Sequence, residues 1–467
     1  MKPLGVVSAT PEQLTVIEDS TPGYWLVRGA AGSGKTTTAL LRLKFLVRLW
    51  RERRTDLGIE APVRVLVLTF NRTLRGYIES LAEQQIALGA DVALEVETFS
   101  HWAMNLVNRP VMDSADREGQ IATLAQEAGG FPWETRFLLG EIDYVLGRYL
   151  PDDLERYLDA ERTGRGQAPR VDRAMRTRLL EGVLRPYRDW KEKEDRWDWN
   201  DLAVSLATEQ IGPAYNIIVV DEAQDFSANQ VRAVVNHLAE DHVTTFIRDS
   251  AQRIYPNSFI WRDVGITFPP VQSKKLNVNY RNTRQIAAFA RPLLEGVEPL
   301  EDSALPDFTG CVRDGPAPVV LRGYYREQLE WSIEYLRSGQ IGPDETVAFL
   351  HPLGWFRDLK KRLDAEGLAW ASIIRASEWP DGPEQIVLST MHSAKGLEFD
   401  HVIAIGYNAE VVRHGDEPHD ALLDEQRRLL AMSVGRARKS VTVGYKPDDA
   451  SRLVAFLDPA TYTAVDL

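Results

Sequence analysis

Cysteine is almost absent from this 467-residue sequence: Cys311 is the only one, so the chain has no disulfide framework. No uncharged apolar run approaches the roughly 18 residues that a membrane span needs, and Met1–Ser8 lacks the apolar core of a secretion signal. Positive charge is not in excess, because the formal net charge is −13, which argues against a protein that coats nucleic acid indiscriminately. A local basic groove remains compatible with that total. Together these absences predict a soluble cytoplasmic protein without membrane contacts.

The composition that is present, 44% hydrophobic and 26% charged residues, is typical of folded soluble proteins. The length corresponds to roughly three folding units. Short runs rich in branched apolar residues alternate with longer amphipathic stretches. The runs cover residues 24–28, 63–69, 216–220, 245–247, 347–350, 386–389 and 401–406. Because they are apolar on both faces and separated by helical segments, they predict an α/β fold with parallel sheets covered on both sides.

The interval 108–200 differs from the rest in composition and hydrophobic pattern, with mixed acidic and basic residues, helix-like spacing and no clear strand-like run. It predicts a helical domain inserted into the α/β fold. Residues 160–188 carry an excess of arginine, which predicts either a phosphate-facing strip or a solvated helix face. The arginines stand at positions 162, 165, 170, 173, 176, 178, 185 and 188.

The strongest chemical signal is Gly-x-x-x-x-Gly-Lys-Thr at residues 29–36, between a strand-like run and a helical pattern. Glycines in such a loop let backbone N–H groups close around phosphates, the lysine neutralises them, and the Thr36 hydroxyl can ligate Mg²⁺. The motif therefore predicts a site for ATP and Mg²⁺. Its predicted nucleotide-binding residues are Gly29, Ala30, Ala31, Gly32, Ser33, Gly34, Lys35, Thr36 and Thr37.

A second signal is the apolar run 216–220, which ends in the carboxylate pair Asp221 and Glu222. Asp221 at the strand tip is predicted to hold Mg²⁺ together with Thr36. Glu222 is predicted to orient and deprotonate a water that attacks the γ-phosphate. This strand lies far beyond the P-loop in the chain, which predicts that the helical interval 108–200 interrupts the first sheet.

These segments stand in the order found in superfamily 1A DNA helicases of the UvrD/Rep type, which the chain resembles over nearly its whole length. Asp-Glu-Ala-Gln-Asp at 221–225 is fairly specific to that family, and residues 389–400 are the most diagnostic match after the P-loop. The resemblance implies two RecA-like P-loop motor domains with parallel sheets. They would comprise residues 1–107 with 201–285, and residues 286–467, with 108–200 inserted into the first.

The resemblance also assigns the remaining nucleotide contacts, from motifs at 10–13, 249–255, 279–282, 389–400 and 425–438. Adenine contacts fall to Gln13 and Tyr280, the ribose contact to Glu398, and the γ-phosphate contacts to Gln252, Arg281 and Arg436. Arg436 would be an arginine finger, which has to reach the γ-phosphate from another structural unit. A second domain is therefore expected to close over ATP. The predicted catalytic residues are Lys35, Asp221, Glu222, Gln252, Arg281 and Arg436.

Single-stranded DNA is the partner that the resemblance implies. Segments 68–71 and 97–101 resemble the two family motifs that touch the strand, through Phe70, Asn71 and Thr98, and His392 would face the DNA path. Because every base offers a π-face, aromatic rings can hold a strand without reading its sequence. Phe70, Tyr255 and Trp261 are the predicted stacking rings, with burial in a core as the alternative for each.

The chain departs from the family in three places. The interval from Arg281 to His392 is short enough for the second motor domain to use it, so the second large accessory domain is expected to be absent or vestigial. The family's Gly-Asp-Pro is replaced by residues 248–251, Arg-Asp-Ser-Ala, and Gly435 stands where threonine is common. The compact form with a single insertion resembles the helicase-like subunits of Gabija-type defence systems.

The leading hypothesis is therefore an ATP-dependent translocase or helicase on single-stranded DNA, 3′ to 5′ by resemblance, acting in repair, replication restart or defence. The alternative is a DNA-sensing ATPase subunit that regulates a partner nuclease in an antiviral complex. A P-loop kinase acting on small molecules is disfavoured, because it needs neither a distant arginine motif nor DNA-facing aromatic residues.

Overall fold

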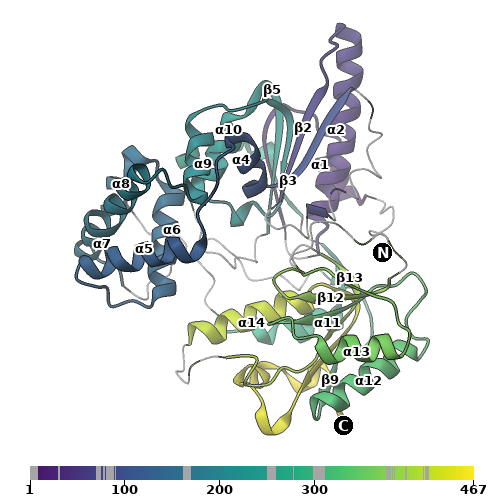
Figure 1. Ribbon diagram of the computed structural model, residues 1–467. Helices are drawn as coiled ribbons and strands as arrows, with labels where there is room; N and C mark the ends of the chain where they lie inside the picture. The colour runs from purple at the N-terminus through teal and green to yellow at the C-terminus, as the bar shows by residue number, and fades with distance from the viewer. Residues whose placement is uncertain are drawn as a thin grey trace.

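The computed structural model describes residues 9–29, 32–69, 75–76, 79, 89, 91–160, 170–249, 259–276, 278–297, 311–374, 380, 382, 384–394, 397–413, 415 and 420–467. It contains two large parallel β-sheets, each with helices on both faces, and a separate group of helices beside the first sheet (Figure 1). The predicted α/β class with two RecA-like domains is confirmed. In the part of the chain just listed, no helix has the length and apolarity needed to cross a bilayer.

Sheet A has six strands in the order β3-β2-β4-β5-β1-β6. The strands are β1 (Gly23–Gly29), β2 (Val63–Thr69), β3 (Val92–Thr98), β4 (Tyr215–Val220), β5 (Leu238–Asp249) and β6 (Ser273–Leu276). All pairings are parallel. Every residue of β4 is buried, which explains why it reads as a continuous apolar run. Both β1 and β4 neighbour β5, so their carboxyl ends meet at one edge of the sheet.

Helices α1 (Pro11–Ile17) and α2 (Lys35–Leu57) cover one face of sheet A, and α4 (Phe99–Val107), α9 (Trp199–Thr208) and α10 (Ala228–Asn236) cover the other (Figure 1). Alternate strand residues supply the two cores: Trp25 packs with the α2 side and Leu26 with the α4 side. Arg42 of α2 is fully buried with its guanidinium 4.2 Å from the Trp25 ring centroid. Burial lowers the pKa of Arg42 to about 10. This arginine joins α2 to the sheet core.

The helical group contains α5 (Ser114–Glu127), α6 (Thr135–Arg148), α7 (Arg173–Leu179) and α8 (Arg185–Lys193), with the turns η1 (Pro151–Leu158) and η2 (Leu180–Leu184). It has its own apolar core, which includes Ile121, Ile142 and Tyr187. At its base, Lys191 Nζ lies 3.1 Å from Asp198 Oδ2 and 2.6 Å from Asp201 Oδ1. Because Asp198 caps α9, this buried ion pair joins the helical group to the layer that covers sheet A.

The arginine-rich stretch of this group makes contacts within the protein. Arg176 donates to the carbonyls of Tyr157 and Ala160, at 2.9 and 2.7 Å. Arg178 lies 4.6 Å from the centroid of the Phe131 ring, and Arg185 pairs with Glu155 at 2.8 Å. Positions 162 and 165 lie outside the described residues. These contacts account for three of the eight arginines by packing and pairing within the helical group.

Sheet C has seven strands in the order β11-β12-β10-β13-β14-β9-β15. They are β9 (Val319–Arg322), β10 (Val347–His351), β11 (Trp370–Ser372), β12 (Ile386–Thr390), β13 (Phe399–Ala404), β14 (Ala437–Tyr445) and β15 (Thr463–Asp466). Helices α12 (Tyr325–Arg337) and α13 (Arg357–Ala365) cover one face, and α11 (Arg284–Ala290) and α14 (Ala421–Val434) the other (Figure 1). A small sheet pairs β7 (Asn279–Thr283) with β8 (Cys311–Arg313).

Short 3-10 turns complete the described structure. They occupy Ala223–Asp225, Trp261–Val264, Pro270–Gln272, Pro292–Leu294, Pro447–Asp449, Arg452–Phe456 and Pro459–Thr461.

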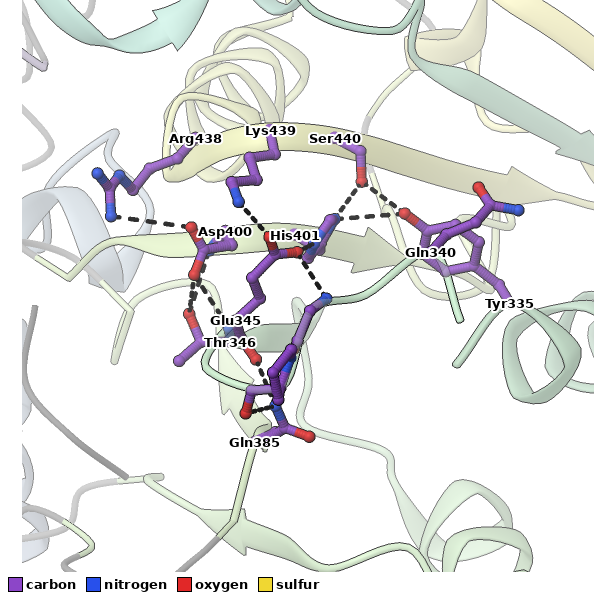
Figure 2. Close-up of polar contacts among 12 residues, drawn as sticks. Tyr335, Gln340, Glu345, Thr346, Gln385, Asp400, His401, Arg438, Lys439 and Ser440 are labelled. Atoms are coloured by element: carbon purple, nitrogen blue, oxygen red, sulfur yellow. Dashed lines mark hydrogen bonds and ion pairs between the residues drawn. The ribbon is translucent and has the colours of Figure 1, made fainter. Parts of the chain in front are cut away.

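A polar network ties three strands together at the amino edge of sheet C (Figure 2). His401 on β13 has Nε2 2.7 Å from Glu345 Oε2 and Nδ1 2.7 Å from Ser440 Oγ of β14. Lys439 also donates to Glu345, which lies just before β10. On the same edge the Thr346 N–H donates to Asp400 Oδ2 at 3.0 Å. The network fixes how the first residues of β13 and β14 lie relative to β10.

Glu345 gives this network a predicted pH dependence. Burial disfavours the ionised carboxylate, but the hydrogen bonds from Lys439 and His401 outweigh burial and lower the pKa of Glu345 to about 2. The stabilisation is therefore fully present above the ordinary pKa of about 4.5 and is lost as the pH falls toward 2. We expect Glu345→Gln to lower Tm at neutral pH, and its difference from wild type to shrink below about pH 4.5 in thermal unfolding.

The control for this prediction is Glu334→Gln, which changes an exposed glutamate of α12. Its effect on Tm should be small at every pH, since exposed charges contribute little to stability. A Tm difference for Glu345→Gln that stays constant between neutral pH and about pH 3 would contradict the assignment.

Candidate functional site

The P-loop lies between β1 and α2 at the carboxyl edge of sheet A. Gly32 and Gly34 have φ values of +82° and +75°, the left-handed region that favours glycine. Helix α2 begins at Lys35, and within the described residues no side chain caps its first turn, so backbone N–H groups there can meet an anion. Lys35 Nζ donates to the Gly29 carbonyl at 3.0 Å, which holds the lysine folded across the loop.

Gln13 lies directly beside this loop. Thr10 and Gln13 form a capping box at the start of α1. The Gln13 side-chain amide also donates to the Ser33 carbonyl at 3.3 Å. A Cβ atom at Gly34 would collide with this amide, so the glycine permits the close approach. The predicted adenine-reading residue is therefore buried against the P-loop.

The carboxylate pair follows β4 at the same edge. Thr36 Oγ1 donates to Asp221 Oδ2 at 3.0 Å, which brings the two predicted metal ligands together. Burial and the adjacent Glu222 raise the pKa of Asp221 to about 7. Glu222 has a φ of +51°, unusual for a residue with a side chain, and its carboxylate accepts a hydrogen bond from the Gln224 amide. Strained backbone of this kind clusters at functional sites.

Three residues reach the same place from the side of sheet C. Arg281 on β7 forms an ion pair with Glu398, which lies just before β13, and Arg436 lies just before β14. Burial opposes ionisation of Glu398, but Arg281 above all, with Arg438 and Arg436, lowers the pKa of its carboxylate. Glu398 is therefore ionised at neutral pH. The polar network at the amino edge of sheet C positions the strands that carry Glu398 and Arg436 (Figure 2).

These groups line one cavity of about 380 Å³. The lining residues are Gly32, Gly34, Lys35, Thr36, Thr37, Asp221, Glu222, Arg281, Glu398 and Arg436. The cavity thus joins the P-loop and the carboxylates of sheet A to two arginines that come from the other side.

The residues present fit ATP and Mg²⁺. The Ser33 hydroxyl and Arg281 Nε are buried polar atoms without a hydrogen-bond partner among the described residues, and a bound polyphosphate offers acceptors for such donors. Thr36 and Asp221 present hard oxygen ligands, the kind that Mg²⁺ prefers. The raised pKa of Asp221 shows that its negative charge lacks sufficient compensation, which a divalent cation would provide.

An asparagine pair that the motif reading passed over joins β7 to the turn before β14. Asn279 Oδ1 accepts from the backbone N–H groups of Arg281 and Asn282, each at 3.0 Å. The Asn282 amide donates to the carbonyls of Gly435 and Ala437, at 3.1 and 2.7 Å. The sequence signal that could have identified this pair is the position of Asn279 and Asn282 on either side of Tyr-Arg. The pair fixes Arg281 against the turn that carries Arg436.

Strand β7 is also bonded to the P-loop, since the Tyr280 N–H donates to the Gly32 carbonyl at 3.1 Å. The Tyr280 ring is half-buried. β7 therefore contacts both sides of the cavity.

Three of the predicted DNA-facing residues lie in the described part of the chain, each on a different element. Thr98 ends β3 beside Thr69 and accepts a hydrogen bond from the His101 N–H at 3.3 Å. Trp261 is half-buried among Phe246, Phe259 and Phe268, with ring centroids 4.9–5.2 Å away, so it takes part in packing. His392 is exposed after β12. The remaining predicted residues outside the described parts are Ala30, Ala31, Phe70, Asn71, Gln252 and Tyr255.

A P-loop on one parallel sheet, facing Arg281 from the small β7-β8 sheet and Arg436 from the edge of a second large parallel sheet, defines a nucleotide-binding protein of the class with two RecA-like domains. Residues 9–263, more than half of the chain, match the family described as UvrD/REP helicase N-terminal domain. Residues 371–447 match the UvrD-like helicase C-terminal domain. The chain belongs to the UvrD/Rep helicase family.

Relatives in this family cover different shares of the chain. A protein of Mycoplasma pneumoniae named "Probable DNA helicase" is 25% identical over 281 residues, 55% of this chain and 50% of the relative. The ATP-dependent DNA helicase UvrD2 of Mycobacterium tuberculosis is 24% identical over 325 residues, 62% of this chain and 44% of the relative. DNA helicase IV of Escherichia coli is 22% identical across 92% of this chain and 67% of the relative. The chain spans about half the length of the first two.

Proposed function

We propose that the chain is an ATP-dependent motor on single-stranded DNA that hydrolyses ATP with Mg²⁺. The observation that supports this most is the cavity of about 380 Å³ that takes its lining from both sheets. A nucleotide in that cavity would contact Lys35, Thr36 and Asp221 on one side and Arg281 and Arg436 on the other. Binding and release of ATP would then change how the two sheets lie relative to one another.

The proposed roles follow from where each group lies. Lys35 and the first turn of α2 bind the phosphates, and Thr36 and Asp221 hold Mg²⁺, which when bound supplies positive charge at the β- and γ-phosphates. Glu222 orients a water and accepts its proton as the new P–O bond forms and the bond to the ADP oxygen breaks. Arg281 and Arg436 stabilise the charge that develops on the transferred group.

One short segment connects the nucleotide to the proposed DNA path. Thr390 ends β12 at the carboxyl edge of sheet C, and Glu398 stands before β13 at the amino edge. The residues between them include exposed His392. A shift of Glu398 with the state of the nucleotide would therefore be transmitted to His392 through only a few residues.

The finer features rest on the resemblance and are part of the proposal. They are the division into motor domains 1–107 with 201–285 and 286–467, the helical insertion 108–200, the cytoplasmic location and 3′ to 5′ movement. A 3′ to 5′ motor moves toward the 5′ end, so it should displace streptavidin from a 5′-biotinylated strand and leave it on a 3′-biotinylated one. Displacement of streptavidin from the 3′-biotinylated strand alone would mean that the protein moves 5′ to 3′.

The first test is steady-state ATP hydrolysis with and without oligo(dT). We expect the strand to increase the rate by about 5- to 150-fold, the range that site-to-site coupling energies usually support. The increase should saturate with oligonucleotide concentration and weaken with salt, because phosphate contacts release counterions. A rate of ATP hydrolysis that does not change when oligo(dT) is added would contradict the proposed motor function. It would favour an ATPase subunit controlled by a protein partner such as a nuclease.

A further inference from the structure

The backbone of Arg436 is hydrogen-bonded on both sides of the residue. Its own carbonyl accepts from the Phe399 N–H at 3.0 Å. The carbonyls before and after it, those of Gly435 and Ala437, accept from the side-chain amide of Asn282 at 3.1 and 2.7 Å. The position of Arg436 therefore depends on a side chain that comes from a different strand, β7.

Asn282 uses all of its polar side-chain atoms in this arrangement. The amide nitrogen donates to the two carbonyls, and Oδ1 accepts from Asn279 Nδ2 at 3.0 Å. Because a backbone carbonyl can only accept, these neighbours determine which way the amide points. Asn282 is fully buried, so water does not take the place of its donors. A shorter side chain would remove one donor from each of two buried carbonyls.

Asn279 extends these contacts to the P-loop. Its Oδ1 accepts from the backbone N–H groups of Arg281 and Asn282, each at 3.0 Å. The same oxygen lies against Gly32, where an added Cβ atom would collide with it. The contacts therefore run from the P-loop through two buried asparagines to the backbone on either side of Arg436.

We propose that Asn282 is a positioning residue for ATP hydrolysis, which holds Arg436 at the distance from the P-loop that the transition state requires. Asn282 does not line the nucleotide cavity, so it acts through Arg436 and not on ATP directly. A misplacement of about 1 Å in a catalytic group can cost about 10²-fold in rate. The inference rests on the proposed function, because it names the side chain that sets the position of the proposed arginine finger.

The test measures kcat for ATP hydrolysis and affinity for a fluorescent ATP analogue, with and without oligo(dT). Asn282→Ala is expected to lower kcat by about 10²-fold and to change the affinity far less, because Arg436 acts mainly in the transition state. Asn282→Ser keeps one donor, so it should lose less, and it replaces the alanine variant if that variant does not bind the analogue. A wild-type kcat, or a loss of affinity as large as the loss of kcat, would contradict the proposal.

The matched control is Asn229→Ala, at the junction of α10 with the helical group. Asn229 is also fully buried, and its amide also donates to two backbone carbonyls, those of Leu146 and Tyr149, at 2.8 and 3.0 Å. Both alanine variants should therefore lower Tm, but only Asn282→Ala should lower kcat. Equal losses of kcat in the two variants would show that the rate follows stability, and the positioning role would be wrong.

A double variant tests whether Asn282 acts through Arg436. Asn282→Ala combined with Arg436→Ala should hydrolyse ATP about as fast as Arg436→Ala alone, because the group that Asn282 positions is already missing. A further loss of about 10²-fold in the double variant would refute the inference. If Arg436→Ala lowers kcat and Asn282→Ala does not, the arginine finger stands without this positioning residue. If Arg436→Ala leaves kcat unchanged, both are wrong.

Discussion

Arg436→Ala is expected to reduce kcat for ATP hydrolysis by about 10³- to 10⁵-fold, the contribution of an arginine that stabilises a transferring phosphoryl group. Arg436 is 3% exposed and lines the nucleotide cavity opposite Lys35 and Asp221. Because the charge it meets develops mainly in the transition state, affinity for ATP should fall far less than kcat. Rapid-quench or steady-state hydrolysis, combined with equilibrium binding of a fluorescent ATP analogue, separates the two effects.

Arg438→Ala is the matched control for this experiment. It removes the same charge two residues further along the chain, from a side chain that does not line the cavity and lies 3.8 Å from Asp400. We expect a small effect on kcat. Arg436→Lys keeps the charge but loses the planar fork, so it should recover only part of the rate. Loss of ATP affinity at an unchanged kcat would refute the role of Arg436 as an arginine finger.

Lys35→Ala is expected to reduce kcat by about 10²- to 10³-fold, the usual cost of removing one donor that stabilises developing charge. Unlike Arg436, Lys35 meets phosphate oxygens already in the ground state, so affinity for ATP should fall as well. A second readout is thermal. Wild type should gain about 2.7 kcal/mol of unfolding free energy at an ATP concentration 100 times Kd, and the variant should gain much less.

The control for Lys35→Ala is Lys44→Ala, which changes an exposed lysine on the same helix, α2. This change should preserve hydrolysis and the stabilisation by ATP. Since the Lys35 side chain bonds to the Gly29 carbonyl, the Tm of the variant without nucleotide checks that the P-loop still folds. A Lys35→Ala protein that is folded and hydrolyses ATP at the wild-type rate would place the nucleotide elsewhere.

Strands buried on both faces were predictable, and half-buried ones were not. The run 63–69 coincides with β2, and 216–220 with all but the first residue of β4, because a buried parallel strand must be apolar throughout. By contrast, β3 alternates acidic residues such as Glu95 and Glu97 with apolar ones. The first residues of β14 are polar because they belong to the network around His401. Neither pattern reads as a buried strand.

The nucleotide site, like the strands, could be predicted from the sequence only in part. The sequence motifs contain both Lys35 and Arg281, and the structure brings them to one cavity. What could not be predicted from the sequence is how Arg281 and Arg436 are held beside each other, through Asn279, Asn282 and the carbonyl of Gly435. Because every residue has a backbone carbonyl, a sequence motif cannot show which carbonyl accepts a hydrogen bond at the site.

By itself, the sequence determined the phosphate-binding loop, because residues 29–36 encode its geometry locally through glycine conformations and the start of a helix. The resemblance already named Arg281 and Arg436, but only the tertiary structure brought them to that loop and decided which exposed ring lies beside the end of β12. Arg281 meets Glu398, and the loop of Trp355 meets Thr390, across long stretches of chain. Many charged and aromatic residues have the right chemistry for such contacts, and packing alone selects the pair that meets.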